Sequence, residues 1–411
     1  MSAGEEPSSI RLMSVEAARE RMLGLVSPMA TEMAPIGEAL GRALAAPVLA
    51  TRAQPPFPAS AMDGWAVRRA DAGAPRRIVG ESAAGRGFTG ELAPGEAVRI
   101  FTGAPVPAGA DLVIVQEEAR VEDGRLIVSA PAAPEAQSQT WIRPAGMDFA
   151  AGDRLLESGV VLDPWRLALA AASGAAQLAV RRRPRVAVLA TGEEVVPPGA
   201  APGPFQIFES GSSALASLTR LWGAEAILLP IAGDDEAAIA DAAQGARADL
   251  LITLGGASVG DHDLVKPALR RLGLELAVES VALRPGKPTW AGRLADGGVV
   301  LGLPGNPASA MVCAELFLRP VLRRLLDLEP RLPMVMARLQ VALPANGPRE
   351  HWMRAELSDA DGVRLVRPFG EQDSSLVGIF ARADALVRRP VKAPAAEVGE
   401  LVEVLRLDRA G

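Results

Sequence analysis

The sequence predicts a multidomain protein of the α/β plus β class. A chain of 411 residues is too long for one hydrophobic core, so we expect two to four domains. Between residues 184 and 329, apolar runs typical of buried strands alternate with helical segments, which indicates βαβ units and a mostly parallel sheet. Short β-type runs separated by Gly and Pro turns fill residues 65–148 and return after residue 330.

The N-terminal part is expected to contain helices and a strand, interrupted by a β insertion. Residues 14–38 are predicted to form two helical pieces, the first capped by Ser14, and residues 40–49 a helix end that runs into a strand. Residues 150–176 return to a helical, mostly apolar pattern. Inside the insertion, strands are expected at residues 96–101, 112–116 and 126–128.

The α/β region continues with strands and helices in alternation. Its strands are expected at residues 186–190, 226–229, 250–254 and 299–303. Its helices are expected at residues 212–222, 234–243 and 264–274, and after Pro307. Pro267 must lie in the first turn of its helix or kink it. The last region should contain strands at residues 335–341, 351–357, 363–366 and 385–389.

These patterns divide the chain into four predicted domains. The two segments that flank the β insertion are expected to rejoin as one elongated N-terminal domain with helices and strands. The chain has no internal repeat at the period of a known repeat family. The predicted domains are residues 10–50 with 150–183 (N-terminal domain), 51–149 (inserted β domain), 184–329 (α/β domain) and 330–411 (C-terminal β domain).

Composition and charge exclude several classes of protein. The net charge is −6 and the densest basic run is only residues 181–183, so no nucleic-acid footprint is present. No apolar run has membrane-spanning length, and the polar first residues do not resemble a signal peptide, so we expect a cytoplasmic protein without a membrane partner. Cys313 is the only cysteine and cannot form an internal disulfide. His262 and His351 are far apart in sequence, which disfavours a histidine-based metal cluster.

The predicted strand at residues 250–254 opens into a glycine-rich loop. Open α/β sheets bind ligands at the carboxyl ends of their strands, where this loop lies. Small residues let backbone N–H groups approach an anion, and two carboxylates suit a hydrated divalent cation. The residues concerned are Gly255, Gly256, Ser258, Gly260, Asp261 and Asp263. An ordinary connection between a strand and a helix fits the same pattern.

A second candidate site is the turn at residues 303–307. Its prolines stiffen the turn, its glycine allows tight backbone passage, and Asn306 can cap a helix that starts at Pro307. Backbone N–H groups and the Ser309 hydroxyl would then face outward and bind an anion. The candidate residues are Pro304, Gly305, Asn306, Pro307 and Ser309. A well-capped helix without a ligand is the alternative.

Charged side chains accompany these two loops. Arg284 and Lys287 flank a Pro-Gly turn and would project two cations, and Glu194 follows the first strand of the α/β domain, where it could orient a ligand or bind a metal. Solvated surface loops remain the alternative for both. Neither residues 255–260 nor residues 302–305 match the G-x-G-x-x-G spacing, and no Walker pattern occurs in the sequence, which disfavours dinucleotide-binding and common nucleotide functions for these loops.

An ordered set of motifs resembles the MoeA family, the molybdopterin molybdenumtransferases, whose relatives include the gephyrin E domain. The resemblance covers residues from about 10 to about 407, with motifs at residues 56–64, 100–105, 146–148, 191–194, 255–260, 285–288 and 303–307. It implies an elongated homodimer of four-domain subunits, with an active site shared between the subunits and a MogA-like third domain. It further implies that adenylylated molybdopterin and molybdate are converted, with Mg²⁺, to molybdenum cofactor and AMP. A MogA-type enzyme is a candidate partner.

The same resemblance implies roles for individual residues. Catalytic roles fall on Asp63, Thr102, Arg143, Asp148, Asp234 and Asp263. The first four would reach the third domain of the partner subunit. Glu194 and Asp263 would hold the cation, and Lys287, Pro304 and Pro307 match the molybdate and phosphate loops. Arg354 and Ser374 would contribute from the fourth domain.

Departures from the family pattern and two other functions stay open. Residues 209–212 are Glu-Ser-Gly-Ser where an Asp-Ser-Asn-Ser type is usual, and Arg284 replaces a usual Lys, which leaves the choice between molybdate and tungstate open. A MogA-like molybdopterin adenylyltransferase would share only the third domain, so the presence of residues 50–150 disfavours it. A non-catalytic scaffold of the gephyrin type could lose acids that this chain retains, namely Asp63, Asp148, Asp234 and Asp263.

Overall fold

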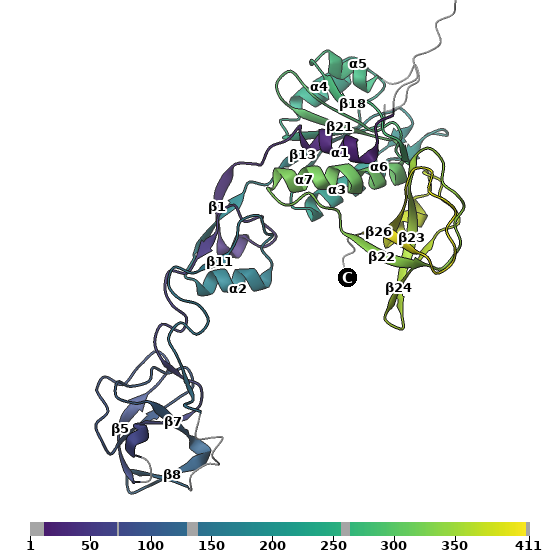
Figure 1. Ribbon diagram of the computed structural model, residues 1–411. Coiled ribbons are helices and arrows are strands. Elements are labelled where there is room, and N and C mark those ends of the chain that lie inside the picture. The colour runs from purple at the N-terminus through teal and green to yellow at the C-terminus, as the bar shows by residue number, and fades with distance from the viewer. Residues whose placement is uncertain (1–11, 72–73, 130–138, 256–263, 408–411) are drawn as a thin grey trace, which may run out of the picture.

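The protein is elongated, with three bodies along its length. The structure, a computed structural model, describes residues 12–71, 74–129, 139–255 and 264–407. Figure 1 shows a β-rich unit at one end, a small middle unit of strands and one helix, and at the other end an α/β body with a C-terminal β unit beside it. None of the helices in the described ranges has the length and apolar character needed to cross a membrane.

The first helix packs on the α/β body, and the middle unit is built from both ends of the interrupted segment. Helix α1 (Val15–Leu23) begins at Ser14, whose Oγ accepts a hydrogen bond of 3.2 Å from the Ala17 backbone N–H. The chain then enters strand β1 (Thr31–Pro35), which pairs antiparallel with β12 (Gln177–Arg181), and a 3₁₀ turn (Ile36–Glu38). The second helix expected within residues 14–38 is therefore wrong, because pairing with a distant strand outweighs the local helical pattern.

The return segment is also less helical than expected. Strand β11 (Arg154–Leu156) pairs with β2 (Val48–Leu49), and only α2 (Pro164–Ala172) is a helix. The Asp163 carboxylate accepts a 2.8 Å hydrogen bond from the Arg166 N–H and fixes the start of α2. The two segments share one small core, formed by Leu44, Leu162, Leu178 and Val180 with their neighbours.

The β unit at the far end is a six-stranded sheet with the order β7-β4-β6-β5-β9-β8. Its strands are β4 (Gly64–Val67), β5 (Arg76–Ser82), β6 (Glu96–Ile100), β7 (Leu112–Val115), β8 (Ala119–Glu122) and β9 (Arg125–Val128). Only the β5–β6 pair is parallel. A short pair, β3 (Ala59–Ser60) with β10 (Ile142–Arg143), lies beside it, and two 3₁₀ turns occupy Arg69–Asp71 and Gln116–Glu118.

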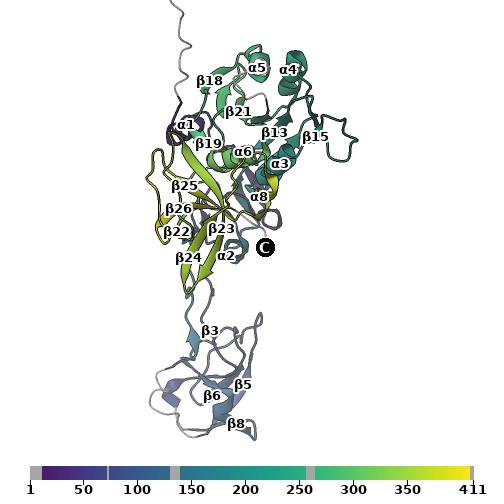
Figure 2. The same cartoon turned by 90° about the vertical axis from the view of Figure 1, so that its right-hand side faces the viewer.

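The α/β body contains a six-stranded sheet with the order β16-β13-β17-β21-β20-β18. Four strands are parallel, β16 (Glu225–Leu228), β13 (Arg185–Ala190), β17 (Leu250–Leu254) and β21 (Val299–Leu303). Next to β21, strand β20 (Trp290–Arg293) runs antiparallel, and the edge strand β18 (Glu275–Val278) pairs antiparallel with β20. A two-residue parallel pair, β14 (Val195–Val196) with β15 (Ile207–Phe208), lies at the periphery of this body (Figure 2). The expectation of a mostly parallel sheet is confirmed.

Helices cover both faces of this sheet. On one face pack α1, α3 (Gly211–Leu221), α6 (Pro307–Cys313), a π-helical turn (Ala314–Leu318) and α7 (Arg319–Leu325). On the other face pack α4 (Glu236–Gly245) and α5 (Val265–Arg270). Helix α5 is shorter than expected, with Pro267 in its first turn.

The C-terminal β unit is a closed barrel. Strands β23 (Glu350–Ala360), β24 (Val363–Pro368), β22 (Met334–Leu339), β26 (Leu401–Arg406) and β25 (Ala385–Arg389) pair in that order, and β25 pairs back to β23. Strand β19 (Leu283–Arg284), from the α/β body, adds to β23. The structure also contains α8 (Val377–Arg382), which the sequence pattern did not predict.

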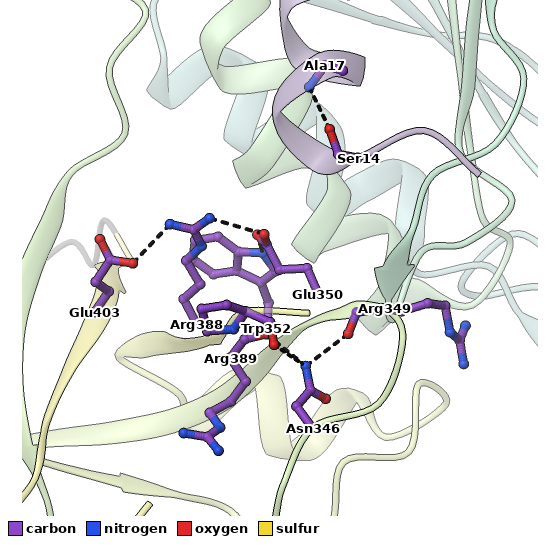
Figure 3. A network of polar contacts seen from close by, with 10 residues as sticks. Ser14, Ala17, Asn346, Arg349, Glu350, Trp352, Arg388, Arg389 and Glu403 are labelled. Atoms are coloured by element: carbon purple, nitrogen blue, oxygen red, sulfur yellow. Dashed lines mark hydrogen bonds and ion pairs between the residues drawn. The ribbon is translucent and has the colours of Figure 1, made fainter. Parts of the chain in front are cut away.

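A polar network lies where the barrel meets α1 (Figure 3). The Glu350 carboxylate accepts hydrogen bonds from Trp352 Nε1 at 2.8 Å and from Arg388 Nη2 at 3.1 Å. Arg388 also donates to Glu403 at 2.9 Å. Because these residues come from three strands of the barrel, the network joins β23, β25 and β26.

The packing of Trp290 supplies a stability prediction. Trp290 is fully buried, and a Cβ at Gly302 on the adjacent strand would overlap its ring. We expect Gly302→Ala to lower the free energy of unfolding by about 3 kcal/mol, because the side chains there cannot move apart without strain. Thermal unfolding would show a lower midpoint. Gly245→Ala, at an exposed helical position with nothing within 4 Å, should be neutral or slightly stabilising, and equal midpoints for both variants would contradict this account.

Candidate active site

A cavity of about 610 Å³ lies at the carboxyl ends of β13, β17 and β21. This is the edge at which open α/β sheets bind ligands. Seven residues singled out in the sequence line it: Glu194, Gly255, Lys287, Pro304, Gly305, Asn306 and Pro307. Four separate loops thus converge on one space.

Two glycines allow the loops to approach one another. Gly192 has a φ of +128°, and a Cβ there would overlap the Glu194 carboxylate, which folds back over this turn. Gly255 has a φ of +91°, and a Cβ there would lie 2.9 Å from the Thr191 carbonyl oxygen. A side chain at Gly255 would therefore push the first and second loops apart, and one at Gly192 would displace the Glu194 carboxylate.

The turn before α6 differs in detail from its expected geometry. Asn306 occupies the N-cap position, but its side chain makes no capping hydrogen bond. Instead its Nδ2 donates to Ser374 Oγ at 3.0 Å, which brings the barrel side of the molecule to the cavity. Ser309 is only 4% exposed and does not line the cavity, because the first turn of α6 is buried together with Ala308 and Ala310. The outward-facing Ser309 hydroxyl expected from the sequence is therefore a wrong prediction.

The loop that carries Lys287 is packed on the interior of the body. Gly286 has a φ of +117°, and a Cβ there would overlap the Cys313 sulfur. Thr289 Oγ1 donates to the Gly286 carbonyl at 2.8 Å and lies 3.1 Å from Cys313 Sγ. Burial raises the pKa of the Cys313 thiol to about 12, so the thiol stays protonated and acts as a packing group. These contacts fix the direction in which Lys287 leaves the loop.

Arg284 lies at a different place from Lys287. Its strand pairs with β23 of the barrel, opposite His351, and Arg284 lines a second cavity of about 610 Å³ with His351 and Arg389. Arg354 is nearly fully buried nearby and donates to Gln372 Oε1. Its Nη2 has no hydrogen-bond partner within the part of the chain that the structure describes, and burial lowers its pKa. Arg284 and Lys287, three residues apart, thus line separate cavities.

The pKa of His351 leads to a pH prediction. This pKa is lowered from 6.5 to about 4, chiefly by burial. Four nearby arginines lower it further, namely Arg284, Arg354, Arg349 and Arg389. Between pH 4 and pH 6.5 the unfolded chain binds a proton at His351 that the folded protein does not bind. The contribution of His351 to the free energy of unfolding is therefore fully present above pH 6.5 and is lost as the pH falls towards 4. The difference between the two pKa values corresponds to roughly 3 kcal/mol.

Urea unfolding at pH 7 and pH 4.5 would measure this effect. We expect wild type to lose more stability between these two values than His351→Gln, which cannot be protonated in this range. Equal losses in the two proteins would exclude His351 as the source.

The residues expected from the β unit form their own small cluster. Asp63 Oδ1 accepts 2.8 Å hydrogen bonds from both the backbone N–H and the hydroxyl of Thr102. These bonds, the backbone one first, and the more distant Arg99 lower the pKa of the Asp63 carboxyl. Arg143 and Asp148 are exposed in the same region of the chain. The β unit, to which Asp63 and Thr102 belong, lies at the opposite end of the molecule from the α/β body (Figure 1).

The other acidic residues expected at the site either lie away from the cavity or fall outside the described residues. Asp234 is exposed and does not line the cavity. Its neighbour Asp235 caps α4 by accepting a 2.7 Å hydrogen bond from the Ala238 N–H. Five candidate residues of the glycine-rich loop lie outside the described residues, namely Gly256, Ser258, Gly260, Asp261 and Asp263.

Several lining residues were missed by the sequence analysis. Glu209 follows β15 and caps α3 through a 2.7 Å bond from the Ser212 N–H. Lys266 lies in the first turn of α5, and Ile207 and Phe208 form an apolar wall. The position of Lys266, shortly after the glycine-rich loop, could have indicated that it lies near the site. Ile207 and Phe208 lie in a short segment without a recognisable motif. Ser210, Glu279 and Ser280 are further polar lining residues that were not expected.

An open sheet with a cavity at the carboxyl ends of its strands, lined by lysines, carboxylates and a proline-rich turn, defines the class of open-sheet α/β proteins whose ligand site lies at this edge. Family models identify the chain more closely. The "MoeA N-terminal region (domain I and II)" matches residues 13–174, the "Probable molybdopterin binding domain" residues 187–324, and the "MoeA C-terminal region (domain IV)" residues 336–407. The chain belongs to the MoeA family.

Individual relatives cover almost the whole chain. A molybdopterin molybdenumtransferase of Nostoc sp. is 36% identical over 93% of this chain and 90% of its own length. Molybdopterin molybdenumtransferase 2 of Mycobacterium tuberculosis is 38% identical over 87% of this chain and 90% of its own. A molybdopterin biosynthesis MoeA protein structure from Pyrococcus horikosii superimposes with a TM-score of 0.83 at 31% identity, over 96% of this chain and 99% of that one.

Proposed function

We propose that this protein is a molybdopterin molybdenumtransferase, which inserts molybdate into adenylylated molybdopterin with release of AMP. The observation that carries this proposal is the cavity at the strand ends, where Lys287, Glu194 and the turn of Pro304 to Pro307 meet. The names of the relatives support the same activity. We take the protein to act in the cytoplasm, after a MogA-type enzyme that supplies the adenylylated substrate.

The residue types suit the reaction. Cleaving the phosphoanhydride leaves negative charge on the phosphoryl oxygens, and lysine ammonium groups in the cavity stabilise that charge. Release of AMP frees the dithiolene to bind molybdenum. Molybdate is an oxyanion, so cationic side chains and backbone N–H groups would also hold it. Lys287 is the described cation that the sequence motif and the cavity share.

A divalent cation fits this cavity as an ion held partly by the substrate. Among the residues that the structure describes, no group of three or more His, Cys, Asp or Glu side chains could hold a metal ion. Mg²⁺ commonly keeps several waters and uses one or two carboxylates together with substrate phosphates. We propose that Glu194, with Asp263, holds Mg²⁺, which would neutralise charge on the phosphoryl oxygens.

We further propose a homodimer with active sites shared between subunits. The cluster of Asp63 and Thr102 lies at the opposite end of the molecule from the cavity, so it could reach such a cavity only in a second copy (Figure 1). The middle unit exposes large apolar side chains, Trp165 at 84%, Met33 at 59% and Leu49 at 52%, which favours burial against another chain.

AMP release tests the proposed function. Purified protein is incubated with adenylylated molybdopterin and Mg²⁺, with and without molybdate, beside an Asp63→Ala/Asp263→Ala variant. We expect AMP release that depends on molybdate and is abolished in the variant. Tight binding without turnover would instead favour a non-catalytic scaffold, and the absence of binding would exclude both functions.

A further inference from the structure

The distribution of lysine in this chain is highly uneven. The sequence has 43 Lys and Arg residues, and only three of them, Lys266, Lys287 and Lys392, are lysines. Lys266 and Lys287 both line the cavity at the strand ends. Since this chain uses Arg at nearly every other cationic position, the presence of two of its three lysines in one cavity favours a role for compact ammonium groups there.

The fold holds Lys266 at this place. Its Nζ lies 5.8 Å from the centroid of the Trp290 ring, close enough for a cation–π interaction. Trp290 is fully buried, and Gly302 on the adjacent strand leaves the space that the ring needs. A fully buried ring therefore contacts the side chain of Lys266, so the core contributes to the position of its ammonium group.

Lys266 and Lys287 come from different elements. Lys266 lies in α5, which follows the glycine-rich loop, and Lys287 lies on the loop packed over Cys313. Two ammonium groups supported independently suit a ligand with two neighbouring negative groups better than a ligand with one. The carboxylates of Glu194 and Glu279 in the same cavity repel anions, so an anionic ligand would need both ammonium groups in order to bind there.

We propose that Lys266 is a further substrate-contacting residue and that Lys266 and Lys287 together make this cavity a diphosphate site, each contacting one of the two phosphoryl groups. The inference rests on the proposed function, whose substrate contains such a linked pair of phosphates. The cavity should therefore bind a diphosphate more tightly than a monophosphate, and the contact made by Lys266 should account for this difference in affinity.

The test compares ADP with AMP, two stable ligands that differ by one phosphoryl group. Calorimetry of the full-length protein would give the dissociation constant of each for wild type, Lys266→Ala, Lys266→Arg and the matched control Lys392→Ala. We expect wild type to bind ADP about tenfold more tightly than AMP, because one charge-assisted contact is added. Lys266→Ala should bring the two constants together, chiefly by weakening ADP, and Lys392→Ala should leave both unchanged.

The Lys266→Arg variant tests whether the ammonium group itself is needed or whether any positive charge at this position is enough. If only charge mattered, Lys266→Arg would behave as wild type; we expect it to recover no more than part of the preference for ADP. Equal weakening of ADP and AMP in Lys266→Ala, an unchanged preference in that variant, or the same loss in Lys392→Ala would each overturn the proposal. Thermal unfolding midpoints confirm that every variant is folded.

These outcomes are independent of the proposed activity. The ratio of the two dissociation constants is measured without turnover, so it can fail while molybdate-dependent AMP release by wild type succeeds. Conversely, a wild-type protein that shows the ADP preference but releases no AMP would retain the diphosphate site and exclude the transferase function.

Discussion

Lys287→Ala is expected to lower kcat/KM for molybdate-dependent AMP release by about 100-fold, because it removes a preorganised cation from a site where charge develops. The direction of Lys287 is fixed by the loop packed on Cys313, through the hydrogen bond from Thr289 to the Gly286 carbonyl. The neighbouring Arg284 cannot easily take its place, because it lines the second cavity. AMP release under limiting substrate measures the effect.

Lys392→Ala is the matched control. Lys392 lies in the C-terminal region, does not line the cavity and is exposed, so its removal should leave kcat/KM unchanged. A Lys287→Ala protein with wild-type kcat/KM would show that this lysine is a solvated surface residue. An equal loss in both variants would point to general charge and not to the position of Lys287.

Mixing two inactive variants is expected to restore activity. If each site combines Asp63 of one subunit with Lys287 of the other, Asp63→Ala and Lys287→Ala homodimers each lack a complete site. A mixed dimer has one site that lacks both side chains and one site that is intact. Random reassortment makes half of the dimers mixed, so activity should return to about a quarter of the wild-type value.

The experiment requires subunit exchange, by mixing after mild dissociation or by co-expression with two different tags. Purification through both tags isolates the mixed dimer, which should reach about half of the wild-type activity per dimer. A mixed dimer as inactive as its parents would exclude a site shared in this way. A matched mixture of Asp63→Ala with Asp148→Ala should gain nothing, since both residues belong to the same end of one subunit.

Local patterns predicted the α/β body well. The apolar run at residues 250–254 is strand β17, buried on both faces, and the loops after the strands supply Glu194, Lys287 and the turn at Pro304 to Pro307. This part succeeds because a buried parallel strand needs a continuous apolar run, and parallel strands bring their carboxyl ends to one edge. Motif and topology therefore pointed to the same cavity.

Where distant segments decide the structure, the sequence alone was insufficient. Residues 31–35 have a helical pattern but form β1, because their partners at residues 177–181 are far along the chain. Arg284 and Lys287 were expected to act together, yet the pairing of Arg284 with His351 on the barrel draws it to another cavity. Ser309 was predicted to face outward from a local helix start, and the core around α6 buries it. In each case a non-local contact outweighs a local preference.

The addition of β19 to the barrel has a mechanical consequence. Leu283 and Arg284 are hydrogen-bonded into the barrel sheet, and three residues later the same backbone presents Lys287 to the cavity. Because of this pairing, rotation or unfolding of the barrel would displace the backbone that carries Lys287. The C-terminal barrel and the catalytic edge of the α/β body should therefore form one cooperative unit. A ligand that binds Lys287 would then protect the barrel from unfolding as well, although it touches no residue of the barrel sheet.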